Sequence, residues 1–155
     1  MSSVYRDLSG LMTGLLANRL TGPLVVRNVP ARTGNRLAAA AVTRIFQPQA
    51  PPEGYLAHMR PELLLDPARL RANAGQVAGL KRQLRAMVPR YPELAMPVEI
   101  LHGTADAVVP HAVHALPLAR QIPGARLTTL EGMGYMPQHG ALGEVLVALR
   151  RLTGA

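Results

Sequence analysis

The sequence predicts an α/β fold that is mostly helical and contains two parallel strands, at about 97–102 and 126–130. Each predicted strand is a short run rich in apolar residues, and each ends in a polar or glycine-rich loop. Between them, residues 112–121 have the composition of a helix, and Pro123 with Gly124 marks its end. Because a strand, a helix and a second strand form a right-handed crossover, the two strands are expected to be parallel.

The apolar run from Leu8 to Leu20 raises the question of a membrane anchor or a signal peptide. The run is too short to span a bilayer, and no clearly basic segment precedes it. We therefore expect an amphipathic helix in this run. With no targeting signal visible, the expected location is cytoplasmic.

Proline and helical periodicity predict the other elements. Residues 47–55 contain Pro48, Pro51 and Pro52, which predict a stiff connector. Asp66 followed by Pro67 predicts the start of a long helix. Its apolar positions recur every three or four residues, at Leu70, Ala74, Val77, Leu80, Leu84 and Met87. A last helix is predicted over 141–152, with a core stripe of Leu142, Val145, Leu146 and Leu149.

Two loops with candidate functional residues follow the predicted strands. Asp106 lies in the loop after the first strand, and Tyr135 lies in the glycine-rich turn after the second. In open α/β sheets, ligands bind in the crevice beyond the carboxyl ends of the strands. The topology therefore predicts that Asp106 and Tyr135 share one rim of the sheet.

The residues of these loops resemble a known family. The stretches Pro97-Val-Glu-Ile-Leu-His-Gly-Thr-Ala-Asp-Ala-Val-Val-Pro110 and Leu130-Glu-Gly-Met-Gly-Tyr-Met-Pro137 are similar to the C-terminal part of α/β-hydrolase enzymes, and the likeness spans residues 96–140. A looser likeness, over Ile45 to Tyr55 and Leu70 to Asn73, points to the helical cap of that family.

The resemblance implies a partial α/β-hydrolase fold. Residues 1–92 would form a helical cap-like region, and residues 93–155 would form the last strand, helix, strand and helix of the hydrolase core. In that family a serine on a G-x-S-x-G elbow attacks the substrate, a histidine takes its proton, and a carboxylate orients the histidine. The likeness places Asp106 at the position of this acid.

The nucleophile of the family is missing from this sequence. The serines are Ser2, Ser3 and Ser9, all ahead of the cap-like similarity, and there is no cysteine. The chain therefore looks truncated relative to the family, and it is predicted to be inactive on its own.

The histidine position of the family is occupied by Tyr135. A phenol has a pKa of roughly 10, so it is protonated at neutral pH and is a poor general base. Where triads have been dissected, loss of the base removes on the order of 10⁴ to 10⁶ in turnover. His139 lies four residues further on and is an unfavourable substitute base, because the spacing moves its ring away from the turn. A polar loop histidine is the favoured interpretation of His139.

Simpler interpretations exist for the other polar residues. Without the family likeness, Asp106 is best interpreted as a loop carboxylate that caps the following helix. His102 is expected to be a structural residue under the loop. His111 and His114 are three residues apart on a helix, but no cysteine or suitably spaced carboxylate completes a metal site, so no metal and no cofactor are predicted.

The charge of the chain raises a different class of function. The formal net charge is +8, which is compatible with a basic module that binds nucleic acid or an anionic membrane. The basic residues are spread over every segment, and four tyrosines and one phenylalanine offer no stacking platform for bases. Solvated helix faces explain the charge better, so neither nucleic acid nor membrane is predicted as a partner.

The sequence supports two functional hypotheses. The first is an α/β-hydrolase-like protein of the ester or acyl hydrolase type, impaired because the serine elbow is missing and Tyr135 replaces the histidine. Its partners would be a small ester-like substrate and a complementary N-terminal hydrolase fragment. The alternative is a non-catalytic binding or interaction protein that uses the cap-like helices and the open edge of the sheet, through which the chain would also self-associate.

Overall fold

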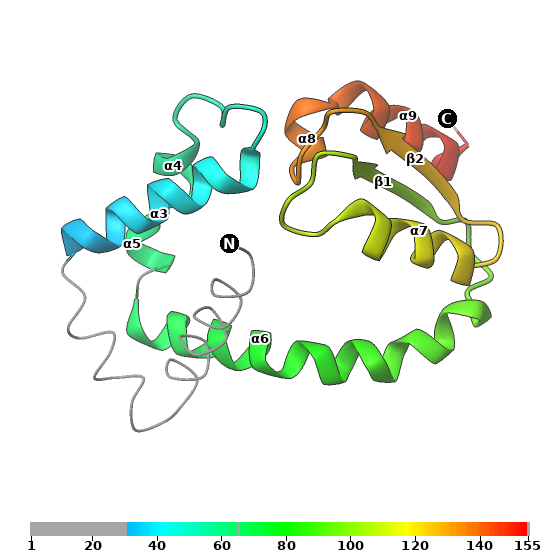
Figure 1. Ribbon diagram of the computed structural model, residues 1–155, viewed down its shortest axis with the longest axis horizontal. Helices are drawn as coiled ribbons and strands as arrows, with labels where there is room; N and C mark the ends of the chain where they lie inside the picture. Colours follow the sequence, from blue (N-terminus) through cyan, green and yellow to red (C-terminus); the bar gives the residue numbers. More distant parts are fainter. Residues whose placement is uncertain (1–30, 65, 155) are drawn as a thin grey trace. The chain divides into compact units, whose positions relative to one another are not determined.

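The computed structural model describes residues 31–64 and 66–154 (Figure 1). The helix expected between Leu8 and Leu20 lies outside the described residues. The described part is mostly helical, with a single two-stranded parallel sheet, which confirms the predicted fold class. No helix in this part is long and apolar enough to cross a membrane.

The contacts divide the described chain into two units. The first contains residues 31–39 and 56–88, and the second contains residues 40–55 and 89–154. Helix α3 (Ala31–Phe46) contributes to both. The predicted division into a cap-like region and a hydrolase core part stays a prediction.

The first unit is dominated by helix α6 (Pro67–Met87), which begins where the sequence predicts. The Asp66 carboxylate accepts hydrogen bonds from the main-chain N–H groups of Ala68 and Arg69, both at 3.1 Å. These bonds satisfy amide groups that a helix start leaves without partners. The short helices α4 (Tyr55–His58) and α5 (Pro61–Leu64) precede α6 along the chain.

The sheet lies in the second unit and consists of β1 (Glu99–Gly103) and β2 (Arg126–Leu130). The strands are parallel, with Leu101 opposite Thr128. A short 3₁₀ helix, η1 (Val88–Glu93), leads into β1. The predicted strand order and direction are therefore confirmed, although β1 begins two residues later than predicted.

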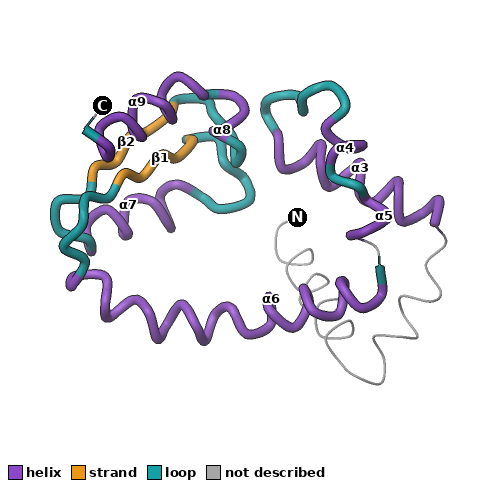
Figure 2. The backbone as a smooth tube through the Cα atoms, turned by 180° about the vertical axis from the view of Figure 1, so that it is seen from behind, coloured by secondary structure: helices purple, strands orange, loops and turns teal. Residues whose placement is uncertain are grey.

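Helices cover both faces of the sheet. Helix α7 (His111–Gln121) connects the strands and lies on one face, and α9 (Leu142–Thr153) lies on the other (Figure 1 and Figure 2). Helix α8 (Pro137–Gly140) joins β2 to α9. The buried apolar residues of this unit lie at the helix–sheet contacts and on α3, and they are Val42, Phe46, Ala115, Ile122, Leu130, Ala141 and Ala148.

The core stripe predicted for the last helix is only partly correct. Val145 is half-buried and Ala148 is buried, whereas Leu142, Leu146 and Leu149 are 55%, 44% and 50% exposed. Periodicity alone does not distinguish the packed side of a helix from an apolar flank beside it, because both repeat every three or four residues.

An ion pair ties the start of β1 to the end of α9. The Arg151 Nε and Nη2 atoms donate hydrogen bonds to the two oxygens of the Glu99 carboxylate, at 2.8 and 2.9 Å. The hydrogen bond from Arg151 lowers the pKa of Glu99 below its usual value. This two-pronged geometry holds α9 across the amino-terminal end of the sheet.

Candidate functional site

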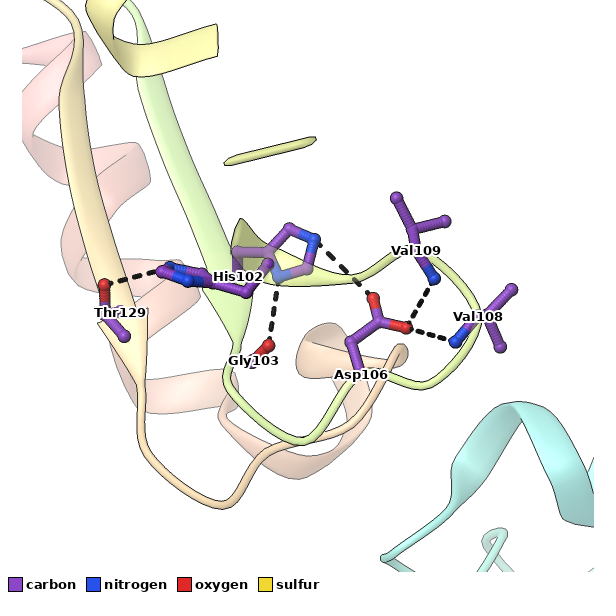
Figure 3. Close-up of polar contacts among 7 residues, drawn as sticks. His102, Gly103, Asp106, Val108, Val109 and Thr129 are labelled. Atoms are coloured by element: carbon purple, nitrogen blue, oxygen red, sulfur yellow. Dashed lines mark hydrogen bonds and ion pairs between the residues drawn. The ribbon is translucent and has the colours of Figure 1, made fainter. Parts of the chain in front are cut away.

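The carboxyl end of β1 carries the first residues of the candidate site. Gly103 ends the strand, and the loop that follows brings Asp106 back beside it (Figure 3). A side chain at Gly103 would collide with the main-chain carbonyl groups of Met133 and Gly134. Glycine is therefore required where the turn after β2 lies against the end of β1. The Ala105 N–H donates a 2.9 Å hydrogen bond to Met133 O and fixes the two loops together.

Asp106 is the buried charged residue of the described chain, at 8% exposure. Its Oδ1 atom accepts hydrogen bonds from the main-chain N–H groups of Val108 and Val109, both at 2.8 Å. These residues precede α7, and the N-cap of α7 is Pro110 with no side-chain capping bond. Asp106 therefore fixes the loop ahead of α7 and does not cap the helix itself.

His102 lies on the other side of the Asp106 carboxylate. The His102 Nε2 atom is 3.6 Å from Asp106 Oδ2, and Nδ1 is 3.0 Å from the main-chain oxygen of Gly103 (Figure 3). A carbonyl oxygen only accepts, so Nδ1 carries the proton of that bond. The Nε2 atom faces Asp106 Oδ2 at ion-pair distance, beyond the length of a hydrogen bond.

The two histidines of α7 have different surroundings. His111 Nε2 is 3.2 Å from Thr129 Oγ1, and its ring meets His102 edge to face with 5.3 Å between ring centroids. Among the described residues there is no group of three or more histidine, cysteine or acidic side chains that could hold a metal ion. His114 is exposed on the same helix.

Tyr135 lies in the turn between β2 and α8, and it is 40% exposed. Gly132, in this turn, has a φ of 67°, a backbone conformation that favours glycine. Within the described residues, the hydrogen bonds and ion pair of the Asp106 side chain go to Val108, Val109 and His102, and none goes to Tyr135.

A glutamine that sequence reasoning did not identify holds the turn of Tyr135. The Gln49 side chain donates from Nε2 to Gly132 O and accepts at Oε1 from Gly134 N, both at 2.9 Å. A side chain at Gly134 would collide with the main-chain oxygen of Gln47. Residues 47–49 therefore dock closely on the turn. The sequence offers no local signal for this contact, because the partners are 83 and 85 residues apart.

His139 is directed into an aromatic cluster. Its ring centroid lies 5.4 Å from that of Phe46 and 5.3 Å from that of Tyr55, and the two aromatic rings are 4.7 Å apart. Phe46 is 2% exposed, so this cluster is part of the packing between α8 and the end of α3. The structure brings Asp106 together with His102, and it places His139 among these rings.

Comparison with known proteins supports the fold alone. No protein-family model matches this chain, and no curated protein matches it. The chain is structurally similar to a protein whose crystal structure is described as that of a membrane phospholipase A, a novel bacterial virulence factor. The two are 18% identical with a TM-score of 0.55, and the match covers 78% of this chain and 39% of the other. This chain thus shares part of the fold of a longer, hydrolase-like protein.

Proposed function

We propose that this chain is the acid-bearing part of an α/β-hydrolase fold that acts on esters, and that its 155 residues do not catalyse the reaction by themselves. The observation that carries the proposal is the buried, oriented carboxylate of Asp106 after a parallel strand, in a fold similar to that of a phospholipase A. The glycine-rich turn with Tyr135 follows the neighbouring strand.

The proposed role of Asp106 is to orient a proton-carrying ring at the site. A triad acid works by accepting a hydrogen bond from an imidazole N–H and stabilising the cation that forms. Two main-chain N–H groups already fix the Asp106 carboxylate in one orientation. Tyr135 supplies no imidazole at the turn, and His102 faces Oδ2 in its place. We infer that the carboxylate serves a structural role in this chain until a base is restored.

The sequence lacks the nucleophile that ester hydrolysis in this family requires. A serine on a sharp elbow and the donors that stabilise an oxyanion would have to come from residues other than these 155. Restoring only the histidine leaves the reaction without a nucleophile, and supplying only the elbow leaves it without a base. Activity is therefore expected only when both changes are made together.

Ester hydrolysis with a four-way comparison tests the proposal. The chain and its Tyr135→His variant are assayed on a short-chain p-nitrophenyl ester, each with and without a polypeptide that carries a G-x-S-x-G elbow and the preceding strands. We expect turnover only for the variant with the added polypeptide, and its loss when Asp106→Asn is combined with Tyr135→His. A Tyr135→Phe variant is the matched control, because it keeps the ring and supplies no base.

Turnover by the chain alone would refute the proposal, because it would require a nucleophile outside the family pattern. Turnover that survives Asp106→Asn would refute the assigned role of this carboxylate. A phospholipid substrate in the same assay asks whether the substrate class named for the structural neighbour extends to the completed site.

A second function is favoured by a separate observation. The described sheet has two strands, so each strand has an edge that no described strand covers. An apolar strand edge is a site for pairing with another chain. A non-catalytic interaction protein built on this edge predicts a stable fold and a defined assembly state without any ester turnover.

A further inference from the structure

The main-chain groups of β1 alternate between two directions. Arg126 N donates to Val98 O, and Thr104 N donates to Leu130 O, so the even-numbered residues of this segment direct their N–H and C=O groups to β2. In a strand, successive residues direct these groups to opposite sides. Those of Glu99, Leu101 and Gly103 therefore point away from β2, toward the edge that no described strand covers. His102 Nδ1 donates to Gly103 O, which keeps a second lone pair.

One flank of α9 lies over β2. A hollow on this side is lined by Thr128 of β2 together with Glu144, Val147, Arg151 and Gly143 of α9. Glu144, Val147 and Arg151 are spaced three and four residues apart, so they share a flank of the helix.

The opposite flank of α9 is apolar and exposed. Leu142, Leu146 and Leu149 are spaced four and three residues apart, and they are 55%, 44% and 50% exposed. Buried Ala148 faces the sheet between the two flanks. Because α9 also contacts β1, and its Glu144 flank lies over β2, the leucine flank lies on the side of the open β1 edge.

The edge of β1 is complementary to itself. In antiparallel pairs, directly opposed residues exchange their N–H and C=O hydrogen bonds in alternation. A two-fold axis at Leu101 would place Leu101 opposite Leu101 of a second copy and Glu99 opposite Gly103. The main-chain groups of Glu99, Leu101 and Gly103, which point away from β2, would then each face the corresponding groups of the second copy. The axis would be perpendicular to the plane of the sheet, so the leucine flanks of the two copies would meet on the same face of the joined sheet.

Charge permits this pairing, because the second unit carries no formal net charge. Its six arginines equal its six carboxylates in number: Arg44, Arg90, Arg120, Arg126, Arg150 and Arg151 against Glu53, Glu93, Glu99, Asp106, Glu131 and Glu144. The formal charge of +8 therefore comes from other parts of the chain. Two copies that meet through this unit therefore bring together parts of the chain that carry no net formal charge.

We propose that a second copy of this chain covers the β1 edge and the leucine flank of α9, forming a four-stranded sheet across a two-fold axis. The proposal goes beyond the proposed function, since it requires no catalytic step. Main-chain hydrogen bonds fix the register around Leu101, and burial of Leu142, Leu146 and Leu149 against their counterparts supplies the apolar contribution. The same edge would also receive an elbow-bearing polypeptide, so the two associations would exclude each other.

Sedimentation equilibrium over a range of protein concentrations tests the proposal. We expect a monomer–dimer equilibrium that Leu146→Glu and Leu149→Glu each weaken on the order of 100-fold, because the substitution enters the interface twice. The matched control is Val147→Glu, at a position of similar exposure on the opposite flank, which should leave the dimer unchanged. Amide hydrogen exchange at Leu101 should slow as the concentration of the unmodified chain rises, and it should not do so in Leu146→Glu.

Three results would overturn the proposal. The first is a chain that stays monomeric at every concentration, including one that binds an elbow-bearing polypeptide instead. The second is a dimer that Val147→Glu weakens as much as Leu146→Glu. The third is a dimer in which the exchange of the Leu101 amide does not depend on concentration. Each result can be obtained without any ester turnover, so it is separate from the test of the proposed function.

Discussion

Replacing Asp106 with alanine tests whether this carboxylate organises the loop between β1 and α7. The substitution removes the acceptor of two main-chain hydrogen bonds of 2.8 Å, and it leaves the N–H groups of Val108 and Val109 without that partner. A hydrogen bond to a charged group contributes about 1.5–3 kcal/mol. Val108 is 42% exposed, so water will replace part of the loss. We expect the free energy of unfolding to fall by about 2–4 kcal/mol.

The isosteric variant separates charge from geometry. Asp106→Asn keeps one neutral oxygen that can accept from the same amides, and it removes the charge that faces His102. We expect a smaller loss, about 1–2 kcal/mol. The comparison is made by urea denaturation followed by circular dichroism, together with hydrogen exchange at the amides of Val108 and Val109. Glu131→Ala, at an exposed position of the other loop, is the control and should change stability by less than about 0.5 kcal/mol. An Asp106→Ala variant that behaved like this control, with no faster exchange at the two amides, would refute the assigned role of this carboxylate.

Three further predictions concern the loops and the ion pair. Gly103→Ala should lower stability by more than about 2 kcal/mol, since its Cβ would collide with a main-chain carbonyl that cannot move away cheaply; equal urea midpoints for variant and parent would contradict this. Gln49→Ala should lower the free energy of unfolding by about 1–2 kcal/mol. Gln49→Glu should lower it more than Gln49→Met does, because a second carboxylate oxygen would face the main-chain oxygen of Gly132. Amide exchange in the turn is the measurement, and unchanged exchange would count against the contact. The pKa of Glu99 is lowered by its hydrogen bond from Arg151. The contribution of this carboxylate to the free energy of unfolding is therefore present above its unfolded-state pKa, and it is lost as the pH falls through the folded-state pKa. Glu99→Gln should therefore flatten the acid side of the curve of urea midpoint against pH, and parallel curves would disprove the linkage.

The elements with strong local signals were predictable from the sequence. Helix α6 starts at Pro67 behind Asp66 as expected, because an N-cap side chain and a proline at the first position act within one turn. The order of β1, α7 and β2 followed from short apolar runs with a helix between them. The turn residues and Asp106 could be located along the chain for the same reason.

The contacts that organise the candidate site were not predictable. Gln49 bonds to a turn more than eighty residues away, and nothing in the connector of residues 47–55 distinguishes its side chain from any other polar one. The pairing of His102 with Asp106 depends on how the loop folds back over the strand end, which spacing alone does not determine. The leucines of α9 followed the expected period, yet their exposure depends on which neighbours the sheet has. Tertiary context decides each of these outcomes.

The contact between Gln49 and the turn of Tyr135 also has a consequence for the order of folding. Hydrogen bonds across 83 and 85 residues can form only after the chain has closed a long loop, and the entropy of closing that loop must be offset before the contact contributes. The strands β1 and β2 are much closer along the chain, so their pairing can come first. The turn is therefore expected to reach its final shape late in folding, when residues 47–49 arrive. During synthesis on the ribosome, Gln49 would emerge long before Gly132 and Gly134, so its hydrogen bonds could form only after those residues had also emerged.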